Sequence, residues 1–379
     1  MTSRVAAGVV LLALVAPAGA RSEGSVTVFG NLRAGFFASE RTARDGAETS
    51  AGEFKLRLRV GAEARLSDGW LVRGRVAGRV TTDQDRTRIW LKAWPPERTG
   101  LEDGDATVDE LFLRYSPSEG RWSLRVGRFQ SSFELHGVPA KGLDRNDSPN
   151  VDITWTDGLH WQYTLNPRWR SHVILQANAS RGSGQVARSP LSFDHRDSRV
   201  TVFAGVEGTA PWGPVTQRMV AVTWMPKALA TDGITAATRH AYLAMTARLF
   251  AEWPLGGTGV RGGLGGEVGY APSTPRERLF DPGSGGDSNG VAWQISANLF
   301  EFAPRHHIGV VYGRAGAGWL ISPDFRNNDS LLEVRHQWRF SRNWSMETRL
   351  RRRKEIVVPG TASGPRVDDD VYLRFSGKF

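Results

Sequence analysis

The chain has 379 residues, with 49 Lys or Arg against 39 Asp or Glu, and its formal net charge is +10. A hydrophobic fraction of 40% provides enough apolar material for a folded core, and a mean hydropathy of −0.36 excludes a bundle of membrane-spanning helices. The absence of cysteine excludes disulfide frameworks, thiolate metal sites and cysteine nucleophiles.

The N-terminus has the pattern of an export signal. Arg4 precedes an apolar run from Val5 to Val15, and Ala18-Gly19-Ala20 supplies a small-residue cleavage site. This pattern predicts a signal peptide at 1–20 that is cleaved after Ala20. A membrane anchor is the alternative, but the run is shorter than the roughly 20 residues that a spanning helix needs. We therefore expect an exported protein whose residues 21–379 form a single domain.

Beyond the signal, apolar and polar residues alternate with a period of two. From Phe54 to Leu66 every second residue is apolar, while the residues between them are Lys55, Arg57, Arg59, Gly61, Glu63 and Arg65. A strand sends such residues to opposite faces, whereas a helix would scatter them. After the turn sequence Ser67-Asp68-Gly69, the alternation resumes at Trp70 and continues to Val80. Two strands of this length, joined by a short turn, can cross a bilayer at a tilt.

The same pattern repeats to the C-terminus. It predicts about sixteen strands, centred near 25–38, 52–67, 70–81, 107–116, 121–130, 157–165, 169–180, 198–208, 215–224, 236–253, 259–270, 290–301, 307–321, 330–341, 344–354 and 369–379. An even number of this size is typical of a bacterial transmembrane barrel. The predicted fold class is therefore all-β, a transmembrane antiparallel β-barrel.

The connections between these strands alternate between short links and long polar segments. The long segments include 82–106, 131–156, 181–197 and 271–289. Outer-membrane barrels keep short turns on the periplasmic side and long loops on the extracellular side. Aromatic residues at strand ends beside the short links predict an interfacial girdle: Trp70, Tyr115, Trp122, Trp169, Trp253, Phe340, Trp344 and Phe379. A soluble β-sandwich, the alternative fold, has no reason to sort its loops and aromatics in this way.

Arginine is concentrated on the polar face of many strands. A charge that faces lipid near the midplane costs about 2–4 kcal/mol, so these side chains are expected to face a wet lumen. Sixteen strands enclose enough space for an aqueous channel. The predicted pore-lining residues are Arg57, Arg59, Arg73, Arg75, Arg335, Arg339, Arg349 and Arg351. Because the first and last strands pair to close the barrel, we expect these arginines on one arc of the wall.

Three segments resemble Gram-negative outer-membrane porins. Val26–Gly35 is similar to the first strand of those proteins, and Leu124–Phe129 is similar to the strand that precedes their constriction loop. The alternating C-terminus, which ends in Phe379, resembles the terminal assembly signal of the family. The arginine excess and Gly127-Arg128-Phe129 look most like the phosphate-selective porin O/P type. That resemblance implies a homotrimer in the outer membrane that passes small anions.

The resemblance also implies that residues 131–156 form a constriction loop. This loop carries Glu134, Lys141, Asp144, Arg145 and Asp147. It lacks both the Pro-Glu-Phe-Gly-Gly stretch of general porins and a lysine-rich phosphate site, so no substrate residue is transferred to it.

Two further motifs have ordinary explanations. Gly257–Gly262 matches a dinucleotide-binding string, but an alternating glycine-rich segment follows it where a helix is required. Glycine on the lumen side instead leaves room for a loop to approach. The basic run 349–354 is explained by the outer end of a strand, with Arg352 at the outer interface, where a lipopolysaccharide phosphate could pair with it.

The sequence therefore predicts a porin for passive diffusion of small hydrophilic solutes, with an anion preference set by fixed arginine charges. Its expected partners are outer-membrane lipid and lipopolysaccharide, and small anionic or neutral solutes; nucleic acid is not expected. No catalytic residue, cofactor or metal site is predicted. The alternatives are a weakly selective or sugar-passing channel whose arginines are neutralised by acids, a barrel hydrolase that uses His172 or His240 with a serine, and a receptor or adhesin that uses the long loops.

Overall fold

The computed structural model describes residues 25–66, 68–82, 91–92, 106–144, 155–178, 189–233, 238–257 and 259–379. The signal peptide predicted at 1–20 lies outside the described residues. The strands of the described part are β1 (Val26–Thr42), β2 (Glu48–Arg65), β3 (Trp70–Thr81), β4 (Leu91–Lys92), β5 (Ala106–Tyr115), β6 (Trp122–Phe129), β7 (Thr156–Asn166), β8 (Trp169–Ala177), β9 (Val200–Gly208), β10 (Val215–Leu229), β11 (His240–Pro254), β12 (Arg261–Tyr270), β13 (Val291–Ala303), β14 (His306–Ala315), β15 (Asp329–Trp338), β16 (Trp344–Glu355) and β17 (Val367–Lys378). Two short 3-10 helices, η1 (Arg196–Ser198) and η2 (Glu277–Leu279), lie in loops. No helix of the described part is long and apolar enough to cross a membrane.

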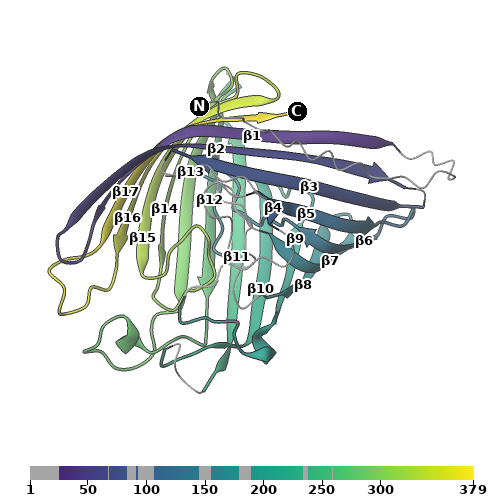
Figure 1. Cartoon of the computed structure of the whole chain (residues 1–379). Coiled ribbons are helices and arrows are strands. Elements are labelled where there is room, and N and C mark those ends of the chain that lie inside the picture. The colour runs from purple at the N-terminus through teal and green to yellow at the C-terminus, as the bar shows by residue number, and fades with distance from the viewer. Residues whose placement is uncertain are drawn as a thin grey trace, which may run out of the picture.

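All of these strands belong to one sheet that closes on itself. Each long strand pairs antiparallel with its neighbours in the chain, and β1 pairs with both β2 and β17. The two-residue β4 pairs only with β5, so sixteen strands make the closed antiparallel wall. Figure 1 shows these strands side by side around the barrel. The predicted fold class and the strand number are confirmed, including the strands predicted at 157–165 and 215–224, which are β7 and β10.

Burial follows the predicted alternation. In β2 the side chain of Leu58 is 44% exposed, whereas its neighbours Arg57 and Arg59 are 1% and 5% exposed. In β3 the exposed Trp70 precedes the buried Leu71 in the same way. A shift of one residue in register would exchange the two faces, so this regular alternation defines an apolar outside and a polar inside.

The short turns lie at the opposite end of the strands from the long connections 271–290 and 316–328, although the short link 43–47 between β1 and β2 lies at the long-loop end. The tight turn before β3 places Gly69 at a φ of 81°, and a Cβ at this position would lie 2.0 Å from the carbonyl oxygen of Ser116. Next to this turn, Trp70, Tyr115 and Trp122 pack in series, with ring centroids 4.6 and 5.4 Å apart. Aromatic rings therefore gather at this short-turn end, which the sequence predicts to be periplasmic.

One predicted strand ends earlier than expected. The strand predicted at 307–321 stops at Ala315, and residues 316–328 turn into the barrel. Gly316 and Gly318 allow the turn, because a Cβ on Gly318 would lie 2.5 Å from Thr274 Cγ2. The apolar run that suggested a strand is instead packed inside, where Trp319 is fully buried. Part of the barrel interior is thus a hydrophobic core formed by loops and wall.

Candidate functional site

Most of the predicted pore-lining arginines lie on the inner face of one continuous arc. Arg57 and Arg59 come from β2, Arg73 and Arg75 from β3, Arg335 from β15, and Arg349 and Arg351 from β16. Strands β15, β16, β17, β1, β2 and β3 are consecutive neighbours in the closed sheet. Arg339 differs, because it follows the last residue of β15 and lies exposed in the short turn, where it donates to Gln337 over 2.9 Å.

On β2 and β3, acids of β5 and of β2 itself contact Arg59, Arg73 and Arg75. Arg59 and Arg75 both bind Asp109, with nitrogen–oxygen distances of 2.9 and 2.8 Å. Arg73 contacts Glu110 at 2.7 Å and Glu63 at 3.3 Å. These carboxylates offset much of the positive charge on this part of the wall.

On β15 to β17, the arginines also share carboxylates. Arg335 donates to Glu333 over 2.5 and 2.9 Å, and the carboxylate of Glu347 lies 3.5 Å from its guanidinium. Arg349 and Arg351 both bind Asp370, the latter at 2.6 Å. The two halves of the arc are therefore built from the same unit, an acid held between two arginines.

Between these halves lies a row of arginines on three neighbouring strands. Arg33 of β1 is directly opposite Arg57 of β2, and Arg57 is directly opposite Arg79 of β3. Opposite residues on neighbouring strands lie about 5 Å apart at their Cα atoms, and like charges in such positions are destabilising. Arg374 of β17 is opposite Gly35, close to the same row. The list predicted from sequence contains only Arg57 of this row, although the alternation of β1, β3 and β17 also points Arg33, Arg79 and Arg374 inward.

The described part of the predicted constriction loop folds into the barrel. Residues 131–144 cross from β6 to the wall formed by β10 to β15, where the wall binds their backbone. Asn298 of β13 accepts a hydrogen bond from the amide of Val138 over 2.8 Å. Gln217 of β10 donates to the carbonyl of Glu134 over 2.8 Å. The loop therefore occupies part of the barrel interior and reaches the edge of the arginine arc at β15.

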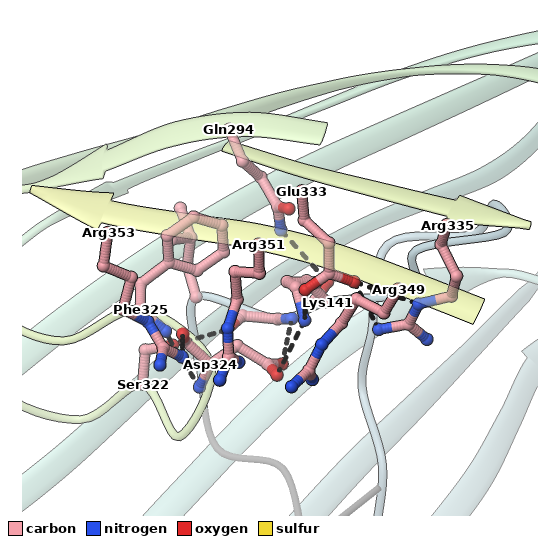
Figure 2. A network of polar contacts seen from close by, with 12 residues as sticks. Lys141, Gln294, Ser322, Asp324, Phe325, Glu333, Arg335, Arg349, Arg351 and Arg353 are labelled. Atoms are coloured by element: carbon pink, nitrogen blue, oxygen red, sulfur yellow. Dashed lines mark hydrogen bonds and ion pairs between the residues drawn. The ribbon is translucent and has the colours of Figure 1, made fainter. Parts of the chain in front are cut away.

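Lys141 is the central anchor of this loop (Figure 2). Its ammonium lies 3.1 Å from Glu333 and 3.5 Å from Asp324, and its side chain is 1% exposed. Gln294 donates to the carbonyl oxygen of Lys141 over 3.0 Å. Burial lowers the pKa of Lys141, and the carboxylates of Glu333 and Asp324 oppose that shift. Glu333 thus links the loop to Arg335 of the arc.

Asp144 provides a second anchor three residues later. Its carboxylate accepts hydrogen bonds from Arg248 and Thr246 of β11. Arg248 also lies 2.8 Å from Glu267 of β12, which accepts a hydrogen bond from the amide of Leu143 over 3.0 Å. Of the predicted loop residues, Arg145 and Asp147 lie outside the described residues.

The inward segment 316–328 supports the loop from its other side. Trp319 donates its indole N–H to the carbonyl of Leu143 over 3.0 Å, and Ser322 donates to the carbonyl of Gly142 over 2.6 Å. Glycines on the inner wall make room for both segments, because a Cβ on Gly265 or Gly269 would lie 3.1 Å from Leu135 or 2.6 Å from Trp319. The glycine-rich stretch of β12 therefore serves packing.

The hydrolase alternative requires His172 or His240 to act together with a serine. The ring of His172 contacts His160 at 3.1 Å and Glu207 at 3.0 Å, while His240 is exposed at the start of β11. His172 is thus held in a chain of ring and carboxylate contacts along the inner wall. Within the described residues, no group of three or more His, Asp or Glu side chains could hold a metal ion.

The comparisons with known proteins agree on the fold. OprB from Pseudomonas putida is 9% identical, with a TM-score of 0.60 over 93% of this chain and 94% of that one. A BenF-like porin from Pseudomonas fluorescens is 12% identical, with a TM-score of 0.57 over 94% and 98% of the chains. An anion-selective porin from Comamonas acidovorans is 11% identical, with a TM-score of 0.53 over 94% and 100%. No family model and no curated protein sequence matches the chain.

The chain therefore has the fold of outer-membrane porins, and its closed barrel with an apolar outer band places it in the outer membrane of a Gram-negative bacterium.

Proposed function

We propose that this protein is an outer-membrane porin that lets small hydrophilic solutes diffuse passively, prefers anions, and catalyses no reaction. The barrel shared with porin channels supports diffusion through the interior. The row Arg33–Arg57–Arg79 supports the preference for anions.

The row carries the proposal because it concentrates positive charge on the inner wall of the barrel. Three guanidinium groups on adjacent strands repel each other, and arginine keeps its charge while binding carboxylate or phosphate through two parallel hydrogen bonds. Positive charge along the wall lowers the electrostatic energy of an anion in the lumen and raises that of a cation. The resemblance to phosphate-selective porins makes phosphate one anion to compare with chloride and small carboxylates.

The reversal potential under a salt gradient in a planar bilayer tests the proposal. One unit charge about 5 Å from a permeating ion contributes about 0.8 kcal/mol in water. Reversing one charge with Arg57→Glu therefore changes the energy of the ion by about 1.6 kcal/mol before screening. At about 0.1 M salt, the anion-to-cation permeability ratio should therefore change severalfold. Arg168→Glu is the matched control, because Arg168 is exposed in the turn between β7 and β8.

We expect an anion-selective wild type, a strong loss of selectivity in Arg57→Glu, and little change in the control. A cation-selective wild type, or equal effects of the two variants, would contradict the proposal. A barrel that shows no conductance would favour the receptor or adhesin alternative.

A weakly selective channel for neutral solutes is the second candidate. The observation that favours it is the sharing of Asp109, Asp370 and Glu347 among the arginines of the arc. Such a channel would give a reversal potential near zero in wild type and would admit sugars in a liposome-swelling assay.

The same resemblance leads us to propose a homotrimer. Chemical cross-linking of the purified protein in detergent should then give three bands, for one, two and three chains. A single band at the mass of one chain would contradict a stable trimer.

A further inference from the structure

The inner wall of β7 and β8 carries two histidines whose ring nitrogens are in contact. Nε2 of His160 on β7 lies 3.1 Å from Nδ1 of His172 on β8, and the two residues are 6% and 3% exposed. A single hydrogen fits between two nitrogens at this distance, so one ring donates and the other accepts. The accepting nitrogen is unprotonated, which is the form in which imidazole binds a metal ion.

The carboxylate of Glu207 on β9 selects His172 as the accepting ring. One of its oxygens lies 3.0 Å from Nε2 of His172, the ring nitrogen that does not contact His160. A carboxylate in this position holds the ring proton on Nε2 and leaves Nδ1 as the acceptor. In metal sites of proteins, such a carboxylate lies behind a ligating histidine, fixes the orientation of the ring and raises its basicity. Glu207 and His172 thus have the arrangement of a ligating histidine and its supporting carboxylate.

Gln162 of β7 brings a third polar group to the same point. It is directly opposite His172 in the register of β7 and β8, and its side-chain amide lies 3.4 Å from Nδ1 of His172. Ser123 of β6 donates to the oxygen of that amide over 3.2 Å. When the amide turns over, its oxygen faces the histidines and the Ser123 hydroxyl accepts a hydrogen bond instead of donating one. Two imidazole nitrogens and one amide oxygen can thus converge on one position.

The spacing of the two ring nitrogens is close to that in a tetrahedral metal site. Two Zn–N bonds of about 2.0–2.1 Å at the tetrahedral angle place their nitrogens about 3.3 Å apart. The observed distance is 3.1 Å, so a metal ion can replace the shared hydrogen after a small movement of the rings. Imidazole ligands favour Zn²⁺, Ni²⁺ and Cu²⁺, whereas Mg²⁺ and Ca²⁺ require oxygen ligands.

Two phenylalanines pack against these rings. The ring of Phe129, the last residue of β6, stacks on His160 with ring centroids 5.9 Å apart, and the ring of Phe133 packs edge-on against His172 at 5.4 Å. His172 is three residues after Trp169, where β8 begins, so it lies about 10 Å from the short turn. The histidine pair is therefore held in place near the short-turn mouth of the barrel.

Two arginines lie beside this pair and its carboxylate. Arg125 of β6 is directly opposite His160 in the register, and Arg170 of β8 lies 3.2 Å from Glu207. Their charges oppose every cation, and an ion that is held by charge alone, such as Mg²⁺, has nothing to offset them. An ion that forms strong bonds to imidazole nitrogen can still bind, so the surroundings add to the selectivity of the ligands.

A second histidine pair, on the outer wall, provides a comparison. Nδ1 of His306 on β14 lies 3.0 Å from Nε2 of His336 on β15, and the His306 ring stacks on Trp338 with ring centroids 5.4 Å apart. Among the described residues, no carboxylate contacts either ring. This pair therefore has the same nitrogen contact as His160 and His172 without the supporting carboxylate.

We propose that His160 and His172 bind one divalent ion of the class of Zn²⁺, Ni²⁺ and Cu²⁺ inside the barrel, with the amide oxygen of Gln162 as the third ligand. A water molecule from the lumen takes the remaining position of the tetrahedron. The carboxylate of Glu207 positions the ring of His172. The ion joins β7 to β8, and its binding does not depend on which solutes the channel admits.

Isothermal titration calorimetry of the untagged mature protein in detergent, after removal of metal with a chelator, tests the site. The titrants are Zn²⁺ and, as an ion of the same charge that prefers oxygen ligands, Mg²⁺. The ligand variant is His172→Gln, and the positioning variant is Glu207→Gln. His336→Gln is the matched control, because it removes one histidine from the outer pair and leaves the inner pair intact.

We expect wild type and His336→Gln to bind one Zn²⁺ per chain and no Mg²⁺ at the same concentrations. His172→Gln should lose this binding, and Glu207→Gln should weaken it about ten- to hundredfold at the same stoichiometry. Equal Zn²⁺ binding by wild type and His172→Gln overturns the site. Loss of binding in His336→Gln places the ion on the outer wall, and equal binding of Mg²⁺ shows attraction to carboxylates alone; each of these results also overturns the proposal.

Electron paramagnetic resonance with one equivalent of Cu²⁺ identifies the ligands. The wild-type spectrum should show coupling to imidazole nitrogen, and Glu207→Gln should keep that coupling at saturating Cu²⁺, because a positioning residue changes the affinity but not the ligands. A spectrum without nitrogen coupling overturns the proposal. Heat-dependent migration in gel electrophoresis checks that each barrel is folded. If His172→Gln does not fold, His160→Gln takes its place, and the wild-type spectrum needs no variant.

Discussion

Replacing Lys141 with methionine should release the constriction loop from the wall. The buried ammonium lies between Glu333 at 3.1 Å and Asp324 at 3.5 Å, and methionine keeps the length of the side chain without its charge. Breaking a buried ion pair costs about 3–5 kcal/mol. Glu333 keeps Arg335, and Asp324 keeps the amide of Gly142, so the lower end of this range, about 3 kcal/mol, applies.

Hydrogen exchange measures this loss directly. The amides of Gly142 and Leu143 donate to Asp324 and Glu267 only while the loop is docked. A loss of about 3 kcal/mol in the local opening free energy accelerates their exchange about a hundredfold. Peptides from 135–144 report the change, and a peptide from β7 serves as the internal reference.

Two controls make the result specific. Lys227→Met removes an exposed lysine of β10 and should leave exchange in the loop unchanged. Glu333→Gln should cost less in the Lys141→Met background than in wild type, because the two side chains share one interaction. Unchanged exchange at 135–144, or an equal acceleration in β7, would refute the role of Lys141 as a local anchor.

Three other predictions follow from the packing and the N-terminal pattern. Gly309→Val should push the loop 131–144 off the wall and raise single-channel conductance, because a Cβ at this position would lie 2.6 Å from Pro139 Cδ. Gly74→Val is the control and should leave conductance unchanged, because a Cβ there would meet only Leu111, at 3.8 Å. Trp319→Ala should lower the free energy of unfolding in urea by about 3–5 kcal/mol, because the indole is fully buried. Trp212→Ala, at an indole that is 72% exposed, should have little effect. Equal urea midpoints for the two variants would contradict a hydrophobic core inside the barrel. N-terminal sequencing of the protein from outer membranes should begin at Arg21, and a mass that includes residues 1–20 would contradict signal cleavage.

The wall of the barrel could be predicted from local pattern because strand alternation is a property of the backbone itself. Successive side chains point to opposite faces, so the apolar residues from Phe54 to Leu66 identify the lipid side without knowledge of any partner. The same rule placed Arg57 and Arg75 inside. It failed for 316–321, where an apolar run is buried by a loop that turns inward, since burial alone does not distinguish wall from loop.

The partners of the arginines could not be read from the sequence. Asp109 binds Arg59 and Arg75 because β5 is placed beside β3 in a particular register, and that register includes an irregularity between Arg75 and Val76. Lys141 meets Glu333 across nearly two hundred residues of chain, with no local signal for either.

By itself, the amino-acid sequence determined the strands, the outward and inward faces, and the ends of the barrel that carry short turns and long loops. Only the tertiary structure decided which charges neutralise each other, where 131–144 and 316–328 dock, and how Arg33, Arg57 and Arg79 line up in one row. The physical reason is range: alternation and turn formation depend on neighbouring residues, whereas register and loop docking depend on contacts between distant segments that exist only after the sheet has closed.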